Sequence, residues 1–144
     1  MLRVVLDSNE FVFGFRGVSE PNKILRLAGV KFECIIPQLI LEEVIRNLKH
    51  REGKDFASFV RDTILRMDMD VLDESGIPHT LIEKYVSKGL KPADALIAAF
   101  TEWVNADLLI SENRHLVREL KPEGFKVLQA KDFIRVLEES ADTI

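Results

Sequence analysis

Short apolar runs alternate along the chain with longer amphipathic stretches. Five short runs predict buried strands, at residues 4–6, 32–36, 71–72, 107–110 and 125–128. Six stretches place apolar side chains at helical spacing and predict helices, at residues 21–29, 38–50, 56–67, 78–86, 93–104 and 131–139. Strands that alternate with helices in this way are typical of an α/β fold with a parallel sheet and helices on both faces.

The composition is that of one ordinary globular domain. The chain has 144 residues, of which 47% are hydrophobic, so we expect a single domain over residues 1–144. Its polar tail, from about residue 138, is expected to fray. The single Cys34 cannot form an internal disulfide, which favours a reducing cytoplasm. No apolar run approaches the ~20 residues of a membrane span.

Charge gives one local signal. The formal net charge is −4, which does not by itself indicate nucleic-acid binding. However, Arg46, Lys49, Arg51 and Lys54 lie close together with only Glu52 against them. Such a basic patch could bind the phosphates of a nucleic acid. The alternative is a polar helix end whose cations complement the helix dipole.

Several oxygen-bearing side chains are predicted to meet at one edge of the sheet. Asp7 directly follows the strand at 4–6, and the turn at 111–113 follows the strand at 107–110. In an open parallel sheet, ligands bind at the carboxyl ends of the strands. Asp94 lies in the first turn of the helix that begins at Pro92. That helix starts at the same edge, because it runs antiparallel to the strand it precedes.

A further acidic side chain obeys the same geometry. Glu42 and Glu43 both lie early in the helix after Pro37, and spacing alone leaves the choice between them open. Carboxylates gathered at one edge are a suitable site for a hard cation such as Mg²⁺ or Mn²⁺, which offsets their mutual repulsion. Each residue also has an ordinary interpretation: a helix cap for Asp7, a complement to the helix dipole for Asp94, and a solvated charge for Glu43.

Four segments resemble, in order, the four motifs of PIN domains. The first is the strand that ends in Asp7-Ser8-Asn9, and the second is the helix after Pro37, where the acidic residue of the motif aligns best with Glu43. The third is Asp94 followed by alanine and aliphatic residues. The fourth is the strand that leads to Ser111-Glu112-Asn113-Arg114. The ordered set extends from residue 4 to about residue 116 and is closest to short prokaryotic VapC-like toxins.

The resemblance implies a fold, a reaction and roles for residues. The fold would be flavodoxin-like, with three α/β/α layers around a parallel sheet of four to five short strands. The protein would be a Mg²⁺- or Mn²⁺-dependent endoribonuclease that hydrolyses single-stranded RNA, with Asp7, Glu43 and Asp94 as metal ligands. Ser111 would form hydrogen bonds within the cluster, and Asn9 would orient the first carboxylate. We also expect RNA contacts from Arg46, Lys49 and Arg51, an antitoxin over the acidic edge, and a homodimer.

One position departs from the family pattern. The fourth acidic position is Asn113, whose neutral carbonyl oxygen removes one negative charge, so that Glu112 would have to replace it or a single metal would bind more weakly. This departure supports an alternative function, a degraded PIN-like module that binds RNA or a protein without cleaving. A phosphatase of the haloacid dehalogenase type is disfavoured because Asn9 stands where its second aspartate is needed. After the first motif, at least two of Phe11, Phe13 and Phe15 are expected to pack in the core, with RNA stacking as the alternative.

Overall fold

The computed structural model describes residues 1–120, 122 and 124–142. Its centre is a five-stranded parallel sheet in the order β3-β2-β1-β4-β5. The strands are β1 (Arg3–Leu6), β2 (Glu33–Pro37), β3 (Met69–Leu72), β4 (Leu108–Ile110) and β5 (Lys126–Leu128). The predicted α/β class and parallel sheet are therefore confirmed, and β3 is longer than the run at 71–72.

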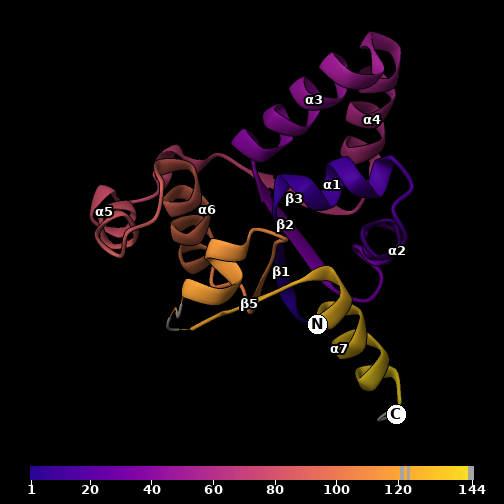
Figure 1. Cartoon of the computed structure of the whole chain (residues 1–144). Coiled ribbons are helices and arrows are strands. Elements are labelled where there is room, and N and C mark those ends of the chain that lie inside the picture. The colour runs from indigo at the N-terminus through magenta and orange to yellow at the C-terminus, as the bar shows by residue number, and fades with distance from the viewer. Residues whose placement is uncertain (121, 123, 143–144) are drawn as a thin grey trace.

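Helices cover both faces of this sheet (Figure 1). They are α1 (Ser8–Phe15), α2 (Ser19–Leu27), α3 (Gln38–Glu52), α4 (Lys54–Arg66), α5 (His79–Ser87), α6 (Pro92–Trp103) and α7 (Ala130–Asp142). Helices α5 and α6 lie on one side, with a π-helical turn at His115–Glu119, and α1 to α4 and α7 lie on the other. The backbone of α7 is helical to Asp142, and fraying of this tail stays a prediction. No helix in the described ranges is long and apolar enough to cross a membrane.

Strand β1 holds the middle of the molecule. Its side chains Val4, Val5 and Leu6 are fully buried, and it pairs with β2 on one side and β4 on the other. The chain therefore adds β2 and β3 on one side of β1, and then adds β4 and β5 on the opposite side. Such a switch point is where open α/β sheets bind ligands, outside the carboxyl ends of the strands.

Helix α1 has no counterpart among the elements predicted from the sequence. Phe11, Phe13 and Phe15 alternate as in a strand, and Gly14 weakens a helix. Tertiary packing outweighs both signals. Phe11 is fully buried and Phe15 packs against the core, which confirms that at least two of the three aromatics are structural. A Cβ at Gly14 would lie 2.5 Å from Leu25 Cδ1, so glycine is what lets α1 and α2 approach each other closely.

A candidate acidic cleft at the carboxyl edge of the sheet

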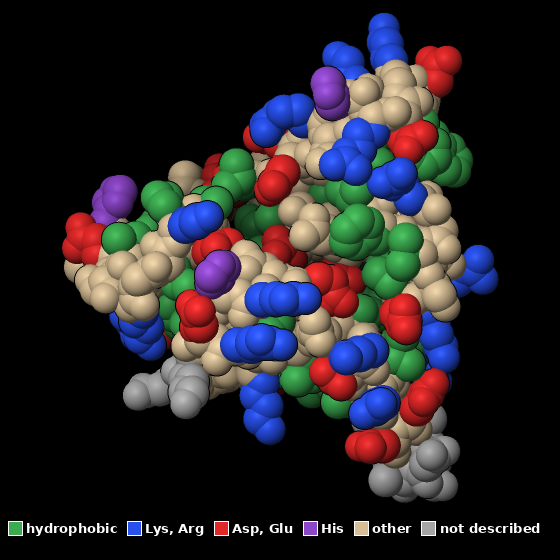
Figure 2. Space-filling view, in the orientation of Figure 1, with side chains coloured by type: hydrophobic (Ala, Val, Ile, Leu, Met, Phe, Trp, Pro, Cys, Tyr) green, Lys and Arg blue, Asp and Glu red, His purple; other side chains and the backbone are tan. Residues whose placement is uncertain are grey.

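The carboxyl ends of β1, β2 and β4 open into a cleft of about 200 Å³. Figure 2 shows a hollow near the middle of this face with acidic side chains gathered around it. The cleft is lined by Asp7, Ser8, Asn9, Pro37, Leu39, Ile40, Glu43, Ala93, Asp94, Leu96, Ile97 and Asn113. The structure thus brings together side chains from the starts of α1, α3 and α6 and from the turn after β4, as the strand and helix ends predicted.

Asp7 is held by two hydrogen bonds at the end of β1. Its Oδ2 accepts from the hydroxyl of the fully buried Ser111 at 2.8 Å, and its Oδ1 accepts from the backbone N–H of Ser8 at 2.8 Å. Burial raises the pKa of the Asp7 carboxyl, and the nearby Asp94 carboxylate adds to the increase, whereas the bonds from Ser111 and Ser8 oppose it. Ser111 therefore lies where the resemblance implied, although it does not line the cleft itself.

Glu43 supplies the third carboxyl group of the cleft. It lies on α3 and lines the cleft, whereas Glu42, which is also exposed, does not. The pKa of the Glu43 carboxyl is raised, chiefly by burial and then by repulsion from Asp7 and Asp94, while Ser8 and Arg46 act in the opposite direction. The mutual repulsion shows that the three carboxyl groups share one electrostatic environment.

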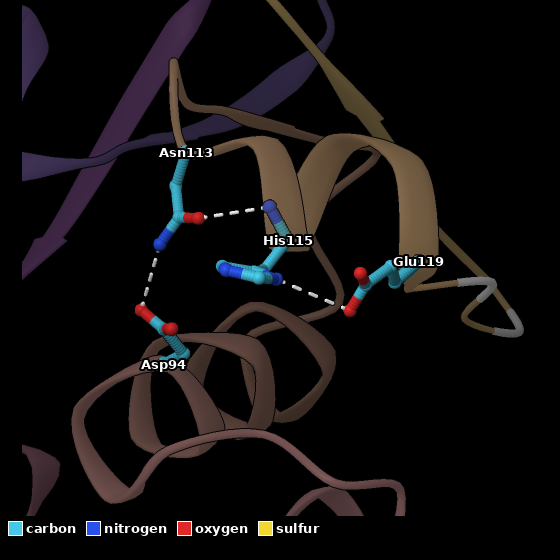
Figure 3. Close-up of polar contacts among 4 residues, drawn as sticks. All are labelled: Asp94, Asn113, His115 and Glu119. Carbon is cyan, nitrogen blue, oxygen red and sulfur yellow. Dashed lines mark hydrogen bonds and ion pairs between the residues drawn. The ribbon is translucent and has the colours of Figure 1, made fainter.

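The side chain of Asn113 bridges the turn after β4 to Asp94 on α6. Its Nδ2 donates to Asp94 Oδ1 at 3.2 Å, and its Oδ1 accepts from the backbone N–H of His115 at 3.0 Å (Figure 3). In this arrangement the carbonyl oxygen of Asn113 faces the backbone of the turn, and its NH₂ group faces Asp94. The amide presents a donor to the acidic cluster.

Two other supporting residues, Glu112 and Asn9, form no hydrogen bond to the cleft carboxylates among the described residues. Glu112 turns away from the cleft, and its carboxylate accepts weakly from the backbone N–H of Ala130, at 3.3 and 3.5 Å, where α7 begins. In this arrangement it does not line the cleft, and its replacement of a fourth acidic ligand stays a prediction. Asn9 lines the cleft, but the hydrogen bonds to Asp7 come from Ser8 and Ser111. An orienting role for Asn9 stays a prediction.

Glu10 was not recognised in the sequence. It lies on α1 and is fully buried, and within the described residues neither carboxyl oxygen has a hydrogen-bond partner. Burial, together with repulsion from Glu112 and Asp7, raises its pKa to about 8. The sequence signal was its spacing of three residues from Asp7, which places it on the inner side of a helix only once residues 8–15 are known to be helical.

The donor set has the chemistry that a hard divalent cation requires. Carboxylate oxygens are the preferred ligands of Mg²⁺ and Mn²⁺, and a cation would relieve the repulsion between Asp7, Glu43 and Asp94. As the side chains stand, no three acidic, histidine or cysteine residues in the described chain are close enough together to hold a metal ion. Convergence of all three on one cation remains a prediction, and it requires side-chain movement, for which the exposed Glu43 has the most freedom.

The basic residues predicted to contact RNA begin next to the cleft. Arg46 lies one helical turn beyond Glu43 on α3, and Lys49 and Arg51 follow toward the end of that helix, all three exposed. Lys49 also lines a shallow depression of about 250 Å³ between α3 and α4, together with Lys54 and Arg61. Arg61 extends this basic surface onto α4 and was not singled out in the sequence.

Solved structures with a similar fold contain VapC toxins. VapBC2 from Rickettsia felis, bound to a DNA fragment from its promoter, has a TM-score of 0.70 at 18% identity and covers 89% of this chain and 98% of that chain. DNA-bound VapBC from Salmonella typhimurium has a TM-score of 0.68 at 18% identity, with coverages of 90% and 99%. VapC20 from Mycobacterium tuberculosis, described as a sarcin–ricin loop cleaving toxin, has a TM-score of 0.55 at 16% identity, with coverages of 74% and 86%.

The sequence itself gives a match at the level of the family. No curated protein matches it significantly. The model of the PIN domain family matches residues 4–121, a range that includes every residue lining the cleft. Sequence motifs, sheet order and family model agree, and the chain belongs to the PIN domain family.

Proposed function

We propose that this protein is a ribonuclease that uses a divalent cation to hydrolyse phosphodiester bonds of single-stranded RNA. The observation that carries the proposal is that Asp7, Glu43 and Asp94 line one cleft at the carboxyl edge of the sheet of a PIN domain. At about 200 Å³ the cleft is small, which suits one extended nucleotide strand and not a duplex.

The three carboxylates would hold the ion, Mg²⁺ or Mn²⁺. Such an ion supplies an activated water and stabilises negative charge on the phosphate. The protein contributes fixed positions for the ligands: Ser111 and the N–H of Ser8 hold the two oxygens of Asp7. Buried apolar residues of α6, such as Ile97, form part of the cleft wall.

The basic surface of α3 and α4 provides a path for the RNA backbone. Arg46 is close enough to lower the pKa of Glu43, so the positive surface begins beside the acidic cleft. Phosphates could follow it from the depression lined by Lys49, Lys54 and Arg61 toward the cleft. Contacts of this kind bind RNA without selecting its sequence.

We extend the proposal to a biological role as the toxin of a toxin–antitoxin pair. Its support is the fold shared with VapC chains that were solved as VapBC complexes. An antitoxin would cover the acidic cleft and so block access of RNA. Expression of the chain alone should then arrest growth of the host cell, and expression of the Asp94→Asn variant should not.

The first prediction concerns cleavage itself. Purified protein should cleave mixed single-stranded RNA in Mg²⁺ or Mn²⁺ and lose this activity in EDTA. Asp94→Asn and Glu43→Gln should each reduce the rate by roughly 100-fold or more, a size typical of removing one group that stabilises transition-state charge. Glu42→Gln is the matched control, because Glu42 is exposed beside Glu43 and does not line the cleft. Equal losses for Glu42→Gln and Glu43→Gln would contradict the assignment.

A second candidate function is an RNA- or protein-binding module that does not cleave. The observation that favours it is Asn113, which places an amide where the family pattern has a fourth acidic residue. The two functions are separated by the same assay. RNA binding that persists without any cation-dependent cleavage would identify the binding module, whereas cleavage that disappears in Asp94→Asn identifies the nuclease.

A further inference from the structure

The orientation of the Asn113 amide is fixed by its partners. The backbone N–H of His115 can only donate, so the atom that faces it at 3.0 Å must be the carbonyl oxygen of Asn113. The NH₂ group then points to Asp94, at 3.2 Å from Oδ1, as Figure 3 shows. A flipped amide would place two donors against each other at one end and two acceptors at the other.

Asn113 is linked by hydrogen bonds to two of the three carboxylates of the cleft, directly to Asp94 and through Ser111 to Asp7. Its side chain donates to Asp94, and its backbone N–H donates to Ser111 Oγ at 3.0 Å. Ser111 in turn donates to Asp7 at 2.8 Å. Each of these two series of hydrogen bonds ends at a carboxylate, one at Asp94 and the other at Asp7. One residue therefore couples the positions of Asp7 and Asp94, which lie on different elements of the fold.

We propose that Asn113 is a positioning residue whose amide holds the Asp94 carboxylate in the cleft when no cation is bound. The inference rests on the proposed function for its significance, because the position of Asp94 matters through the cation it would bind. Asn113 therefore acts as a hydrogen-bond donor to Asp94 and not as a direct ligand.

The comparison with aspartate explains why an amide is suited to this position. An aspartate at 113 could still accept from His115, but its second oxygen would face Asp94 Oδ1 at about the distance of the present hydrogen bond. Two carboxylates in such contact repel unless a cation or a proton lies between them. With asparagine, a hydrogen bond holds Asp94 in place and needs neither a cation nor a proton between the two side chains. The same residue lowers the negative charge available to a cation by one.

The test compares wild type with Asn113→Asp, Asn113→Ala and a matched control, Asn105→Asp. Asn105 is exposed at the end of α6 and has a φ of 55°, which aspartate also tolerates. In EDTA, Asn113→Asp should melt a few °C below wild type. Asn105→Asp adds its charge at the carboxyl end of α6, and Mn²⁺ should raise its melting temperature no more than that of wild type. Added Mn²⁺ should raise the melting temperature of Asn113→Asp more than that of wild type.

Calorimetry with Mn²⁺ provides a second measurement. Asn113→Asp should bind roughly tenfold more tightly than wild type because of its added charge. Asn113→Ala should bind more weakly than wild type, because Asp94 is no longer held. In NMR spectra of the cation-free protein, Asp94→Ala should shift the side-chain NH₂ signals of Asn113. Melting of Asn113→Asp at the wild-type temperature in EDTA, or unshifted NH₂ signals, would overturn the inference.

Failure of this inference differs from failure of the proposed function. The EDTA melts and the NMR shift need neither cation nor RNA. If they behave as expected while wild type cleaves no RNA, the positioning role stands and the nuclease proposal fails. If they do not, while RNA is cleaved and Asp94→Asn abolishes cleavage, the nuclease proposal stands and the role of Asn113 fails.

Discussion

The buried carboxyl group of Glu10 lacks a hydrogen-bond partner among the described residues because the backbone N–H it would use is bonded elsewhere. Asp7 caps α1 and Glu10 follows three residues later, which is the spacing of a capping box. In that motif the glutamate would accept from the N–H of the cap residue. Here the N–H of Asp7 donates to the carbonyl of Ile110 across the sheet at 2.9 Å. Pairing of β1 with β4 thus leaves the Glu10 carboxyl without its usual partner.

This arrangement predicts that stability falls as pH rises. The pKa of Glu10 is about 8 in the folded protein against its ordinary 4.5, so the folded state keeps its proton where the unfolded state has lost it. Stability attributable to Glu10 is therefore full below pH 4.5 and is lost progressively up to about pH 8. The loss is at most about 5 kcal/mol, at 1.36 kcal/mol per pH unit.

Urea unfolding at several pH values, in EDTA, measures this effect. Glu10→Gln keeps the shape and removes the charge, so it should be more stable than wild type at pH 8 and lose less stability between pH 5 and pH 8. Asp7, Glu43 and Glu112 also have raised pKa values, so some pH dependence should remain. The exposed Glu42→Gln is the control and should follow wild type. A Glu10→Gln curve parallel to wild type would show that Glu10 carries no such penalty.

At the scale of elements, α3 joins the acidic cleft to the basic surface within one helix. Replacing Arg46, Lys49 and Arg51 together with alanine, which preserves helix propensity, should weaken RNA binding uniformly across sequences. The slope of log affinity against log salt should fall by up to about 2, from three lost phosphate contacts at roughly 0.7 each for single strands. Fluorescence anisotropy at several salt concentrations measures both quantities.

A control for this variant removes cations at the opposite edge of the sheet. Lys31 just precedes β2 and Lys126 begins β5, and both are exposed at the amino ends of the strands. Replacing both lysines with alanine should leave the slope of log affinity against log salt unchanged. If the slope falls by as much per removed charge as in the α3 variant, RNA affinity depends on net charge and not on the position of the basic residues. Unchanged binding by the α3 variant at low salt would make these cations an ordinary helix end.

The sequence predicted those helices and strands whose hydrophobic pattern matches the secondary structure that packing in the fold imposes. Strand ends and helix starts are marked by Asp7, Pro37 and Pro92, and these are the points that place the acidic side chains at one edge. Helix α1 was missed because its pattern is that of a strand, and only its packing against α2 decides otherwise. Glu10 depends on that helix and so was missed with it.

The direction of a side chain within a loop is a different problem. Whether position 112 or 113 faces the cleft depends on partners distant in the sequence. Glu112 is turned away by a hydrogen bond from the start of α7, and Asn113 is turned inward by His115 and Asp94. Spacing along the chain contains no information about either partnership, so the directions of these two side chains could not be predicted from the sequence.

For the whole molecule we predict a homodimer. Phe59 and Leu65 are exposed apolar residues on α4, with 61% of each exposed, and burial against a second copy would remove this apolar area from water. Light scattering should give twice the chain mass of 16.5 kDa, and Phe59→Ser with Leu65→Ser should reduce it to the monomer. Val30→Ser is the control, since Val30 is also largely exposed, at 66%, but lies in the turn before β2. A monomeric wild-type protein would contradict the prediction.

The bond between Asp7 and Ser111 has a consequence for synthesis of the protein on the ribosome. Its partners are 104 positions apart, and β1 lacks one of its two neighbouring strands until residues 108–110 have been made. A growing chain therefore carries Asp7 and Glu43 long before it can assemble the cleft around them. If the finished protein cuts RNA, its own messenger and ribosome are protected until most of the chain has been translated, because the nuclease does not exist before β4 takes its place in the sheet.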